Sequence, residues 1–452
     1  MLSPRQSLSR FPLTCKGLLL LAFCFAVYPA VAQEREPLEI YASRRAALRQ
    51  ALPDGMIILF GQQETEGSEA YFRFRQENNF YYLTGHDEPG ATLVMNLSTT
   101  PANDVAAAPF PPETLYLPRK NLSQSQWTGP KADPSSAGIT TETGFATVQD
   151  DESFERDVRG VSPAPRILYT LLADPHGAET QQALARERVA YLKKLFPSAD
   201  VRDARKALAD LRQLKSDSEL ALIRKAVDCT IRGLRAAASE LRPGLMEYQS
   251  AAMLKFTFER EGCLFASFDP IIASGPRSTI LHYNRNTARM ESGDLVIMDV
   301  GAEFSRYAAD ITRTFPVAGK FSPRQQEIYE IVLAAQKAAI AAVKPGAKFS
   351  DLQKIAYDYI NSHGKDSKGD RLGKYFTHGL SHHVGIDVHD LANPSATLQP
   401  GMVITVEPGI YLPDENLGVR IEDMLLVTID GSTSLTDSLP RDPADIEALV
   451  GQ

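Results

Sequence analysis

The sequence is poor in several residue types, and each shortage removes a class of protein. Its 452 residues include only four cysteines and one tryptophan. Lysine and arginine together number 48 against 56 aspartates and glutamates, so no basic excess exists to attract nucleic acid. With 43% hydrophobic and 23% charged residues, the composition is that of a soluble globular protein, and the length predicts two or three domains.

The N-terminus is the exception to this ordinary composition. Three basic residues precede an apolar run over 17–31, and Ala30-Val31-Ala32 has the small-x-small pattern of a cleavage site. We therefore predict that residues 1–32 are a signal peptide and that the protein is exported, periplasmic or secreted. The run is short for a membrane-spanning helix, which disfavours an uncleaved anchor. A lipoprotein is also disfavoured, because phenylalanine rather than a small residue precedes Cys24.

Processing leaves an acidic chain with very little cysteine. Removal of residues 1–32 takes away three basic and no acidic residues, leaving 45 basic against 56 acidic residues and a net charge of −11. Only Cys229 and Cys263 remain, too few for a disulfide framework or a zinc cluster. They allow one bridge, but two buried thiols are the preferred interpretation.

The stretch from Leu295 to Phe315 contains two short apolar arms around a polar turn, which predicts a β-hairpin. Folded about a midpoint between Phe304 and Ser305, the hairpin places Asp299 directly opposite Asp310. Two carboxylates on one face of an apolar hairpin repel, unless one is protonated or a cation lies between them. Divalent cations prefer such oxygen ligands. A polar hairpin in which two aspartates merely pair is the alternative for this stretch taken alone.

The first half of the mature chain is predicted to be an α/β domain. Apolar segments bounded by turn residues predict strands at 55–61, 91–95 and 114–117. Loops are predicted at 99–112 and 129–144. A helix near 203–213 joins this half, which has no dense set of metal ligands, to the next. The predicted domains are residues 33–205 and 206–452.

The second half contains a repeated pattern. Capping boxes at Ser216 and Ser322 each open a helix, a Pro-Gly pair follows each helix, and a second helix comes next. Ser350 is expected to cap the second helix of the later copy. Gly293–Gly301 also resembles Gly401–Gly409 at an offset of 108 residues. We interpret the pattern as a duplicated helix–helix–hairpin unit, with chance similarity of two apolar strands as the alternative.

The second hairpin, from Val403 to about Val427, offers another pair of carboxylates. Glu407 occupies the position that Asp299 holds in the earlier copy, and Glu422 lies on the returning arm. Arg420 shares a strand face with Glu422 because side chains alternate with a period of two.

The histidines are few but concentrated. The chain has eight, and four of them, His378, His382, His383 and His389, fall within twelve positions. His282 precedes the first hairpin by about the distance at which His389 precedes the second. Imidazole together with carboxylates suits zinc, manganese or cobalt.

In this order the motifs resemble the pita-bread metallopeptidases, the superfamily of methionine aminopeptidase, prolidase, creatinase and Xaa-Pro aminopeptidase. The resemblance covers about residues 213–445. Phe74–Gly85 resembles the N-terminal domain of the creatinase/prolidase branch. The implied fold is α/β (α+β), with an N-terminal creatinase/prolidase-like domain and a C-terminal duplicated pita-bread catalytic domain.

All ligand positions of that family's dinuclear metal centre are present. They are Asp299, Asp310, His382, Glu407 and Glu422. By similarity, Asp310 and Glu422 bridge the metals, Asp299 holds one, and His382 and Glu407 hold the other. Family members commonly work with two manganese ions, and cobalt or zinc can substitute. Glu407 is implied as the proton shuttle.

The resemblance also assigns residues around the metals. His282 and His389 match substrate-side histidines, which would donate to the carbonyl oxygen as charge develops on it. His378 matches an outer histidine, Tyr411 a tyrosine near the metals, and Arg420 a residue that orients the ligand carboxylates. His383 matches no family role.

Within the superfamily, His378–His382 and Tyr307–Pro316 look most like Xaa-Pro aminopeptidase; prolidases more often have glycine in place of Ser381. The implied activity is release of an N-terminal residue that precedes proline, by attack of a metal-bridging hydroxide. The alternative is an Xaa-Pro dipeptidase, and a remote one is a non-peptidase binding protein of the same fold, although such relatives lose metal ligands.

The resemblance further implies a homo-oligomer, because relatives are dimers or tetramers. The expected partners are peptides with proline in second position, without nucleic acid or stable membrane association after processing. Trp127 resembles a tryptophan that some relatives bring to the proline pocket of a neighbouring subunit. The alternative is a buried residue of the N-terminal domain.

Overall fold

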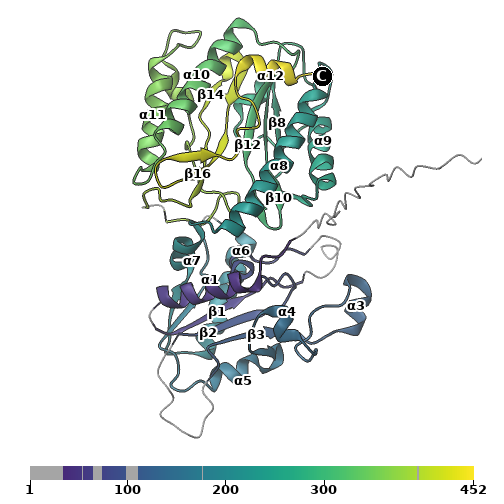
Figure 1. Cartoon of the computed structure of the whole chain (residues 1–452), viewed down its shortest axis with the longest axis vertical. Helices are drawn as coiled ribbons and strands as arrows, with labels where there is room; N and C mark the ends of the chain where they lie inside the picture. Colours follow the sequence, from purple (N-terminus) through teal and green to yellow (C-terminus); the bar gives the residue numbers. More distant parts are fainter. Residues whose placement is uncertain are drawn as a thin grey trace, which may run out of the picture. The chain divides into compact units, whose positions relative to one another are not determined.

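The computed structural model describes residues 34–451 except 53, 65–73, 98–109, 176 and 394–395. The predicted signal peptide, and most of the loop predicted at 99–112, lie outside the described residues. The first described region builds a mixed six-stranded sheet in the order β4-β3-β2-β1-β5-β6 (Figure 1). Its strands are β1 Met56–Phe60, β2 Thr92–Asn96, β3 Glu113–Leu117, β4 Val148–Asp150, β5 Ile167–Thr170 and β6 Asp200–Asp203. The three strands predicted from apolar runs are thereby confirmed.

Helices cover both faces of this sheet, which explains why its central strand is apolar throughout. Ile57 and Leu59 of β1 belong to one hydrophobic cluster, and Met56 and Ile58 to another. A strand buried on both faces requires such a continuous run. The helices of this region are α1 Leu38–Ala51, α2 Asn78–Thr84, α3 Leu122–Thr128, α4 Ile139–Thr143, α5 Phe154–Arg159, α6 Glu179–Leu195 and α7 Arg205–Arg212. Among them α3 buries no residue.

The loop predicted at 129–144 is wrong at its end, where α4 forms. Ile139 is its only large apolar residue, too weak a periodic signal to predict a helix. The helix near 203–213 is confirmed as α7.

The rest of the chain repeats one arrangement of two helices followed by paired strands, which confirms the duplicated domain (Figure 1). The first copy comprises α8 Asp217–Ser239, α9 Glu247–Arg260, β7 Phe265–Ala266, β8 Ile271–Ser274, β9 Leu295–Val300, β10 Ala302–Phe304, β11 Tyr307–Ala308 and β12 Ile311–Pro316. The second comprises α10 Pro323–Ala341, α11 Phe349–Ser362, β13 Val403–Val406, β14 Gly409–Leu412, β15 Leu417–Arg420, β16 Asp423–Val427 and β17 Ser432–Ser434. The terminal helix α12 spans Pro443–Leu449.

Both predicted capping boxes form. The Ser216 side chain accepts from the Glu219 amide, and the Ser322 side chain accepts from the Gln325 amide. The Ser350 cap is wrong, because α11 begins at Phe349 and its N-cap residue, Lys348, makes no side-chain cap. A Pro-Gly turn orients the chain before α11, so the helix starts without a serine cap.

The first hairpin forms, but not in the predicted register. Its turn residues are Ser305 and Arg306, both with positive φ, and Phe304 pairs with Tyr307. Asp299 consequently faces Thr312, so the predicted direct opposition of Asp299 and Asp310 is wrong. The period of two still puts Asp310 on the face of Thr312, which leaves the aspartates as diagonal neighbours.

The second hairpin forms as predicted, with one carboxylate on each arm. Val406 pairs with Asp423, and Gly409 pairs with Arg420. Glu407 and Glu422 therefore occupy opposite positions in the short break between these two ladders.

The two cysteines that follow the predicted signal peptide form a disulfide, so the preference for two buried thiols is wrong. Cys229 of α8 is bonded to Cys263, which follows α9. The helices α8 and α9 lie side by side (Figure 1), an arrangement that a 34-residue separation in sequence does not reveal.

Candidate metal centre

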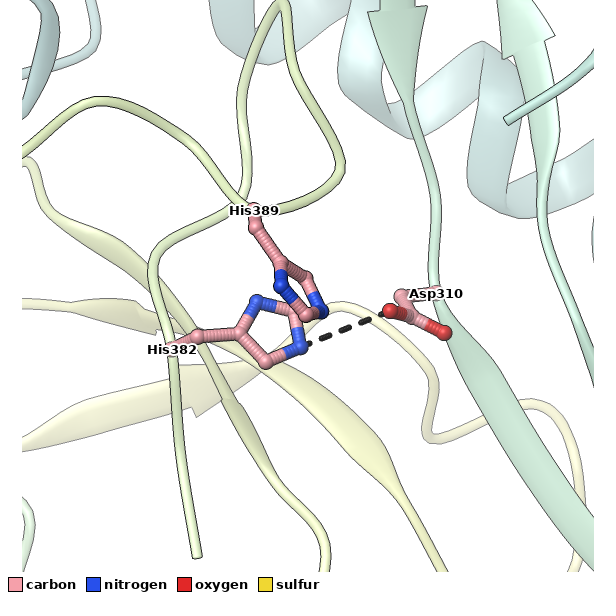
Figure 2. Close-up of side chains that lie close together, drawn as sticks. All are labelled: Asp310, His382 and His389. Carbon is pink, nitrogen blue, oxygen red and sulfur yellow. Dashed lines mark ion pairs between the residues drawn. The ribbon is translucent and has the colours of Figure 1, made fainter. Parts of the chain in front are cut away.

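The predicted ligand residues converge where the two hairpins are broken. Donor atoms of Asp299, Asp310 and Glu422 lie within 4.8 Å of one another, and so do those of His382, Glu407 and Glu422. A third such group contains Asp310, His382 and His389. In Figure 2, His382 and His389 approach Asp310 from a loop on the opposite side. Asp310, His382 and Glu422 each belong to two of these groups, so the three groups form one connected cluster of candidate ligands.

The carboxylates at this position are crowded and buried. Burial raises the pKa of Asp310, and the charge of Asp299 raises it further despite a hydrogen bond from His382. Burial also raises the pKa of Glu422 well above its ordinary range, together with the charges of Asp310 and Glu407. The buried Oδ1 of Asp299 has no hydrogen-bond partner among the described residues. Divalent cations compensate this combination, so the residues present fit a metal centre.

His382 is oriented as a metal ligand. Its Nδ1 lies 3.1 Å from the carbonyl oxygen of His383, to which it donates. This leaves Nε2 facing the carboxylates, 3.3 Å from Glu407 Oε1 and 3.5 Å from Asp310 Oδ2. Ligating histidines usually hold their second nitrogen in this way. Burial disfavours the charged ring, but hydrogen bonds to Asp310 and Glu407 outweigh it and raise the pKa of His382 to about 10. A metal ion would take the place of that proton.

A chain of hydrogen bonds through Arg420, Tyr411 and His378 holds the Asp299 carboxylate in position. Arg420 Nη2 lies 2.6 Å from Asp299 Oδ2, and its Nη1 donates to the Tyr411 hydroxyl at 2.8 Å. That hydroxyl lies 2.8 Å from His378 Nε2. His378 Nδ1 in turn donates to the Gly379 carbonyl at 2.9 Å. The structure thus joins the three residues predicted around the metals into one network that fixes a ligand carboxylate.

The two histidines predicted to lie on the substrate side, His282 and His389, are exposed, unlike the buried candidate ligands Asp299, Asp310 and Glu422. The His389 ring centroid lies 4.1 Å from that of His382. Burial lowers the pKa of His389, and the neighbouring His382 and His282 lower it further. Both side chains are therefore accessible from solvent, and the surroundings of His389 favour its neutral form.

His389 is one of the residues that line a cavity of about 1590 Å³, whereas none of the five candidate ligands lines it. Its walls come from both halves of the chain, including Arg75 and Asn78 from the first and Glu303 and Asp387 from the second. Ligand pockets typically occupy about 300–1,000 Å³, so this cavity has room for a peptide.

Two threonines that the sequence analysis missed support the ligands. Thr312 donates to Glu422 at 2.8 Å, and Thr405 donates to Glu407 at 3.3 Å. Each lies two residues from a predicted ligand, Asp310 in one case and Glu407 in the other. The period of two along a strand could have identified them.

Two residues without an assigned role are also located. His383 is buried against Phe349, and neither of its ring nitrogens has a partner among the described residues. Trp127 is 84% exposed on α3, so the alternative of a buried tryptophan is wrong.

A sheet domain followed by a duplicated domain that gathers carboxylates and imidazole at two broken hairpins defines a pita-bread metallopeptidase. The model described as Metallopeptidase family M24 matches residues 221–429. The model described as Aminopeptidase P, N-terminal domain, matches residues 41–166. The chain belongs to metallopeptidase family M24, in its aminopeptidase P branch, and is a metallo-aminopeptidase.

Individual relatives extend over nearly the whole chain. An Xaa-Pro aminopeptidase of Escherichia coli is 31% identical over 91% of this chain and 97% of its own length. An Xaa-Pro dipeptidase of Pyrococcus horikoshii is 40% identical, but over 54% of this chain and 70% of its own. A solved structure of zinc-substituted aminopeptidase P from Escherichia coli, in complex with product, is 28% identical with a TM-score of 0.79. It covers 92% of this chain and 98% of its own.

Proposed function

We propose that this protein is an Xaa-Pro aminopeptidase, which releases an N-terminal residue that precedes proline. The observation that carries the proposal is the near full-length similarity to an Xaa-Pro aminopeptidase, combined with an intact ligand set. Similarity to the dipeptidase is higher in identity but covers little more than half of the chain.

The proposed cofactor is a pair of divalent ions, with manganese as the proposed metal. Asp299, Asp310, His382, Glu407 and Glu422 would hold them. When bound, such ions lower the pKa of water and supply hydroxide near neutrality.

The residues of the chain would perform the remaining steps. Glu407, beside His382, would accept a proton from the attacking water and deliver it to the leaving proline nitrogen. His389 and His282 would donate to the carbonyl oxygen of the scissile bond as it gains charge. Arg420, acting through Asp299, would keep the ligand set in place.

Peptide length separates the aminopeptidase from the dipeptidase. A dipeptidase must close the site beyond proline, whereas the cavity here is larger than a dipeptide requires. We expect good turnover of an Xaa-Pro-Xaa tripeptide, poor turnover of an Xaa-Pro dipeptide, and almost none without proline in second position. The measurement is kcat/KM for each peptide with manganese present. A tenfold preference for the dipeptide, about 1.4 kcal/mol in transition-state binding, would favour prolidase instead.

We also propose that the protein is exported after removal of residues 1–32. The disulfide between Cys229 and Cys263 supports this, because structural disulfides persist mainly in oxidising compartments. None of the helices in the described residues has the length and apolarity needed to span a bilayer. N-terminal sequencing of the recovered protein should begin at Gln33, and an intact Met1 on membrane-bound protein would contradict cleavage.

A further inference from the structure

The segment from His382 to Asp390 carries a metal-ligand candidate at one end and a substrate-side histidine near the other. Its ends are joined, because the Asp390 amide donates to the His383 carbonyl at 2.8 Å. That carbonyl also accepts the proton of His382 Nδ1. Inside the segment, the Asp387 amide donates to Asp390 Oδ1 at 3.3 Å. His389 therefore lies between two aspartates whose positions determine where its ring points.

Arg212, the last residue of α7, contacts both of these aspartates. Its Nη2 lies 2.5 Å from Asp387 Oδ2 and 2.5 Å from Asp390 Oδ1. Only 2% of the side chain is exposed. Lys215 adds a second cation to Asp390 at 2.8 Å. Two cations thus balance two carboxylates, which offsets the cost of burying Arg212, Lys215 and Asp390.

The same cluster reaches the N-terminal sheet domain. Arg212 Nη1 donates to Asn79 Oδ1 at 2.6 Å, and Asn78 Nδ2 donates to Asp387 Oδ1 at 2.5 Å. Both asparagines belong to α2, whose first turn is capped by Glu77. The histidine segment is therefore tied to a rigid element of the other domain.

We propose that Arg212 is a positioning residue for His389. The proposal rests on the proposed function and deepens it. The planar guanidinium reaches Asp387, Asp390 and Asn79 in directions that a single ammonium group cannot reproduce. When the Arg212 guanidinium contacts Asp387 and Asp390, it anchors the chain on both sides of His389. The His389 ring then faces the His382 and Asp310 side chains. If lysine replaces Arg212, the positive charge remains, but the segment from His382 to Asp390 is no longer held in this geometry.

The first expected effect is on turnover. Arg212→Lys should lower kcat by about 10²-fold, the loss typical of a small misplacement of a catalytic group, with little change in KM. Metal analysis should still find two ions per chain, because the ligand residues are unchanged.

The decisive measurement is a double-mutant cycle with His389→Ala. If Arg212 acts through His389, Arg212→Lys costs little further activity once His389 is absent. Should Arg212→Lys prove unstable, Asp387→Asn removes the same contact at a partly exposed carboxylate and enters the same cycle.

Arg45→Lys is the matched control. Arg45 is equally buried, pairs with both oxygens of Glu113 at 2.9 Å, and does not contact the histidine segment. It should lower the melting temperature while leaving kcat within about twofold of the unmodified protein, the difference expected away from the catalytic geometry.

Additive losses from Arg212→Lys and His389→Ala, or an equal loss of kcat in Arg45→Lys, would overturn the inference. Loss of metal in Arg212→Lys would also overturn it, because the effect would then run through His382. These results leave the proposed function standing if the unmodified protein cleaves Xaa-Pro-Xaa. An inactive unmodified protein with two ions bound would refute the function and the inference together.

Discussion

The two hairpins bear equivalent ligands but are closed differently. The first turns on two residues, Ser305 and Arg306, both with positive φ. The second turns over Pro413–Asn416, where only Asn416 has positive φ. The second turn is centred between Asp414 and Glu415, which leaves Glu407 and Glu422 directly opposed. The first is centred between Ser305 and Arg306, which sets the two aspartates of that hairpin diagonally. The duplicated unit therefore preserves the positions of the candidate ligands, while the register set by each turn decides how they pair.

Where the strand pairing of each hairpin is interrupted, a side chain from an equivalent helix forms hydrogen bonds with the backbone. In the second copy, Gln336 Nε2 of α10 donates to the Val406 and Ile421 carbonyls at 3.0 and 3.1 Å. In the first copy, Thr230 Oγ1 of α8 accepts from the Ala302 amide at 2.9 Å. Each side chain lies 14 residues after the capping serine of its helix. Backbone groups that leave a ladder must find other partners, and the helix beneath provides them.

The largest expected effect comes from replacing the candidate ligands and comparing the two hairpins. Asp310→Asn should lose both metal ions and essentially all peptidase activity, because a bridging residue serves both. Glu422→Gln, its counterpart in the second hairpin, should behave alike, whereas Asp299→Asn should lose metal from one position. Metal content measured after loading with manganese tests this, and normal occupancy in Asp310→Asn would rule out its bridging role.

The next effect concerns a feature that only the first copy has. Ala335 and Lys365 occupy the places in the second copy that Cys229 and Cys263 hold in the first. Replacing both cysteines by alanine should lower the free energy of unfolding by about 2–4 kcal/mol, because the unfolded chain loses a constraint. Urea denaturation measures the change. A reducing agent should produce a similar loss in the unmodified protein and none in the variant.

A smaller effect is expected from removing the hydrogen bonds that Gln336 donates between the two strand ladders of the second hairpin. Gln336→Met keeps the length of the side chain but removes the donor to two buried carbonyls and to Asp423 Oδ2, 2.9 Å away, at a cost of about 2 kcal/mol. Manganese should also bind more weakly, since those carbonyls directly precede Glu407 and Glu422. Thr230→Val is the counterpart in the first copy and should cost about 1 kcal/mol. Unchanged stability and metal affinity in Gln336→Met would show that the break needs no support from α10.

The smallest effect is expected at the turn of the second hairpin. Asn416 is exposed with a φ of 51°, a conformation that glycine adopts without strain. Asn416→Gly should therefore change the free energy of unfolding by less than about 0.5 kcal/mol, whereas Asn416→Ala should cost about 1 kcal/mol. Equal stability of the two variants, measured by urea denaturation, would show that backbone strain is unimportant there.

Local patterns in the sequence were sufficient to predict much of this protein. The apolar run of β1, the capping boxes at Ser216 and Ser322, and the helix before the second domain all follow from interactions between near neighbours. A cation between the hairpin carboxylates could also be predicted, because carboxylates spaced along two apolar arms repel one another unless a cation or a proton lies between them. The full set of candidate ligands, His382 included, was implied by the resemblance to the pita-bread metallopeptidases.

The pairing of distant groups was decided only in the tertiary structure. Neither Ser305 nor Arg306 is the glycine or asparagine that signals a tight turn. The turn is instead held by the other domain, where the Glu34 amide donates to Ser305 Oγ at 2.6 Å and Arg306 pairs with Asp87. Likewise, the Cys229–Cys263 bond and the contacts of Arg212 join segments that meet only after packing. The sequence by itself thus determined which groups the protein carries, whereas long-range packing decided which of them touch, because such contacts leave no periodic trace in the chain.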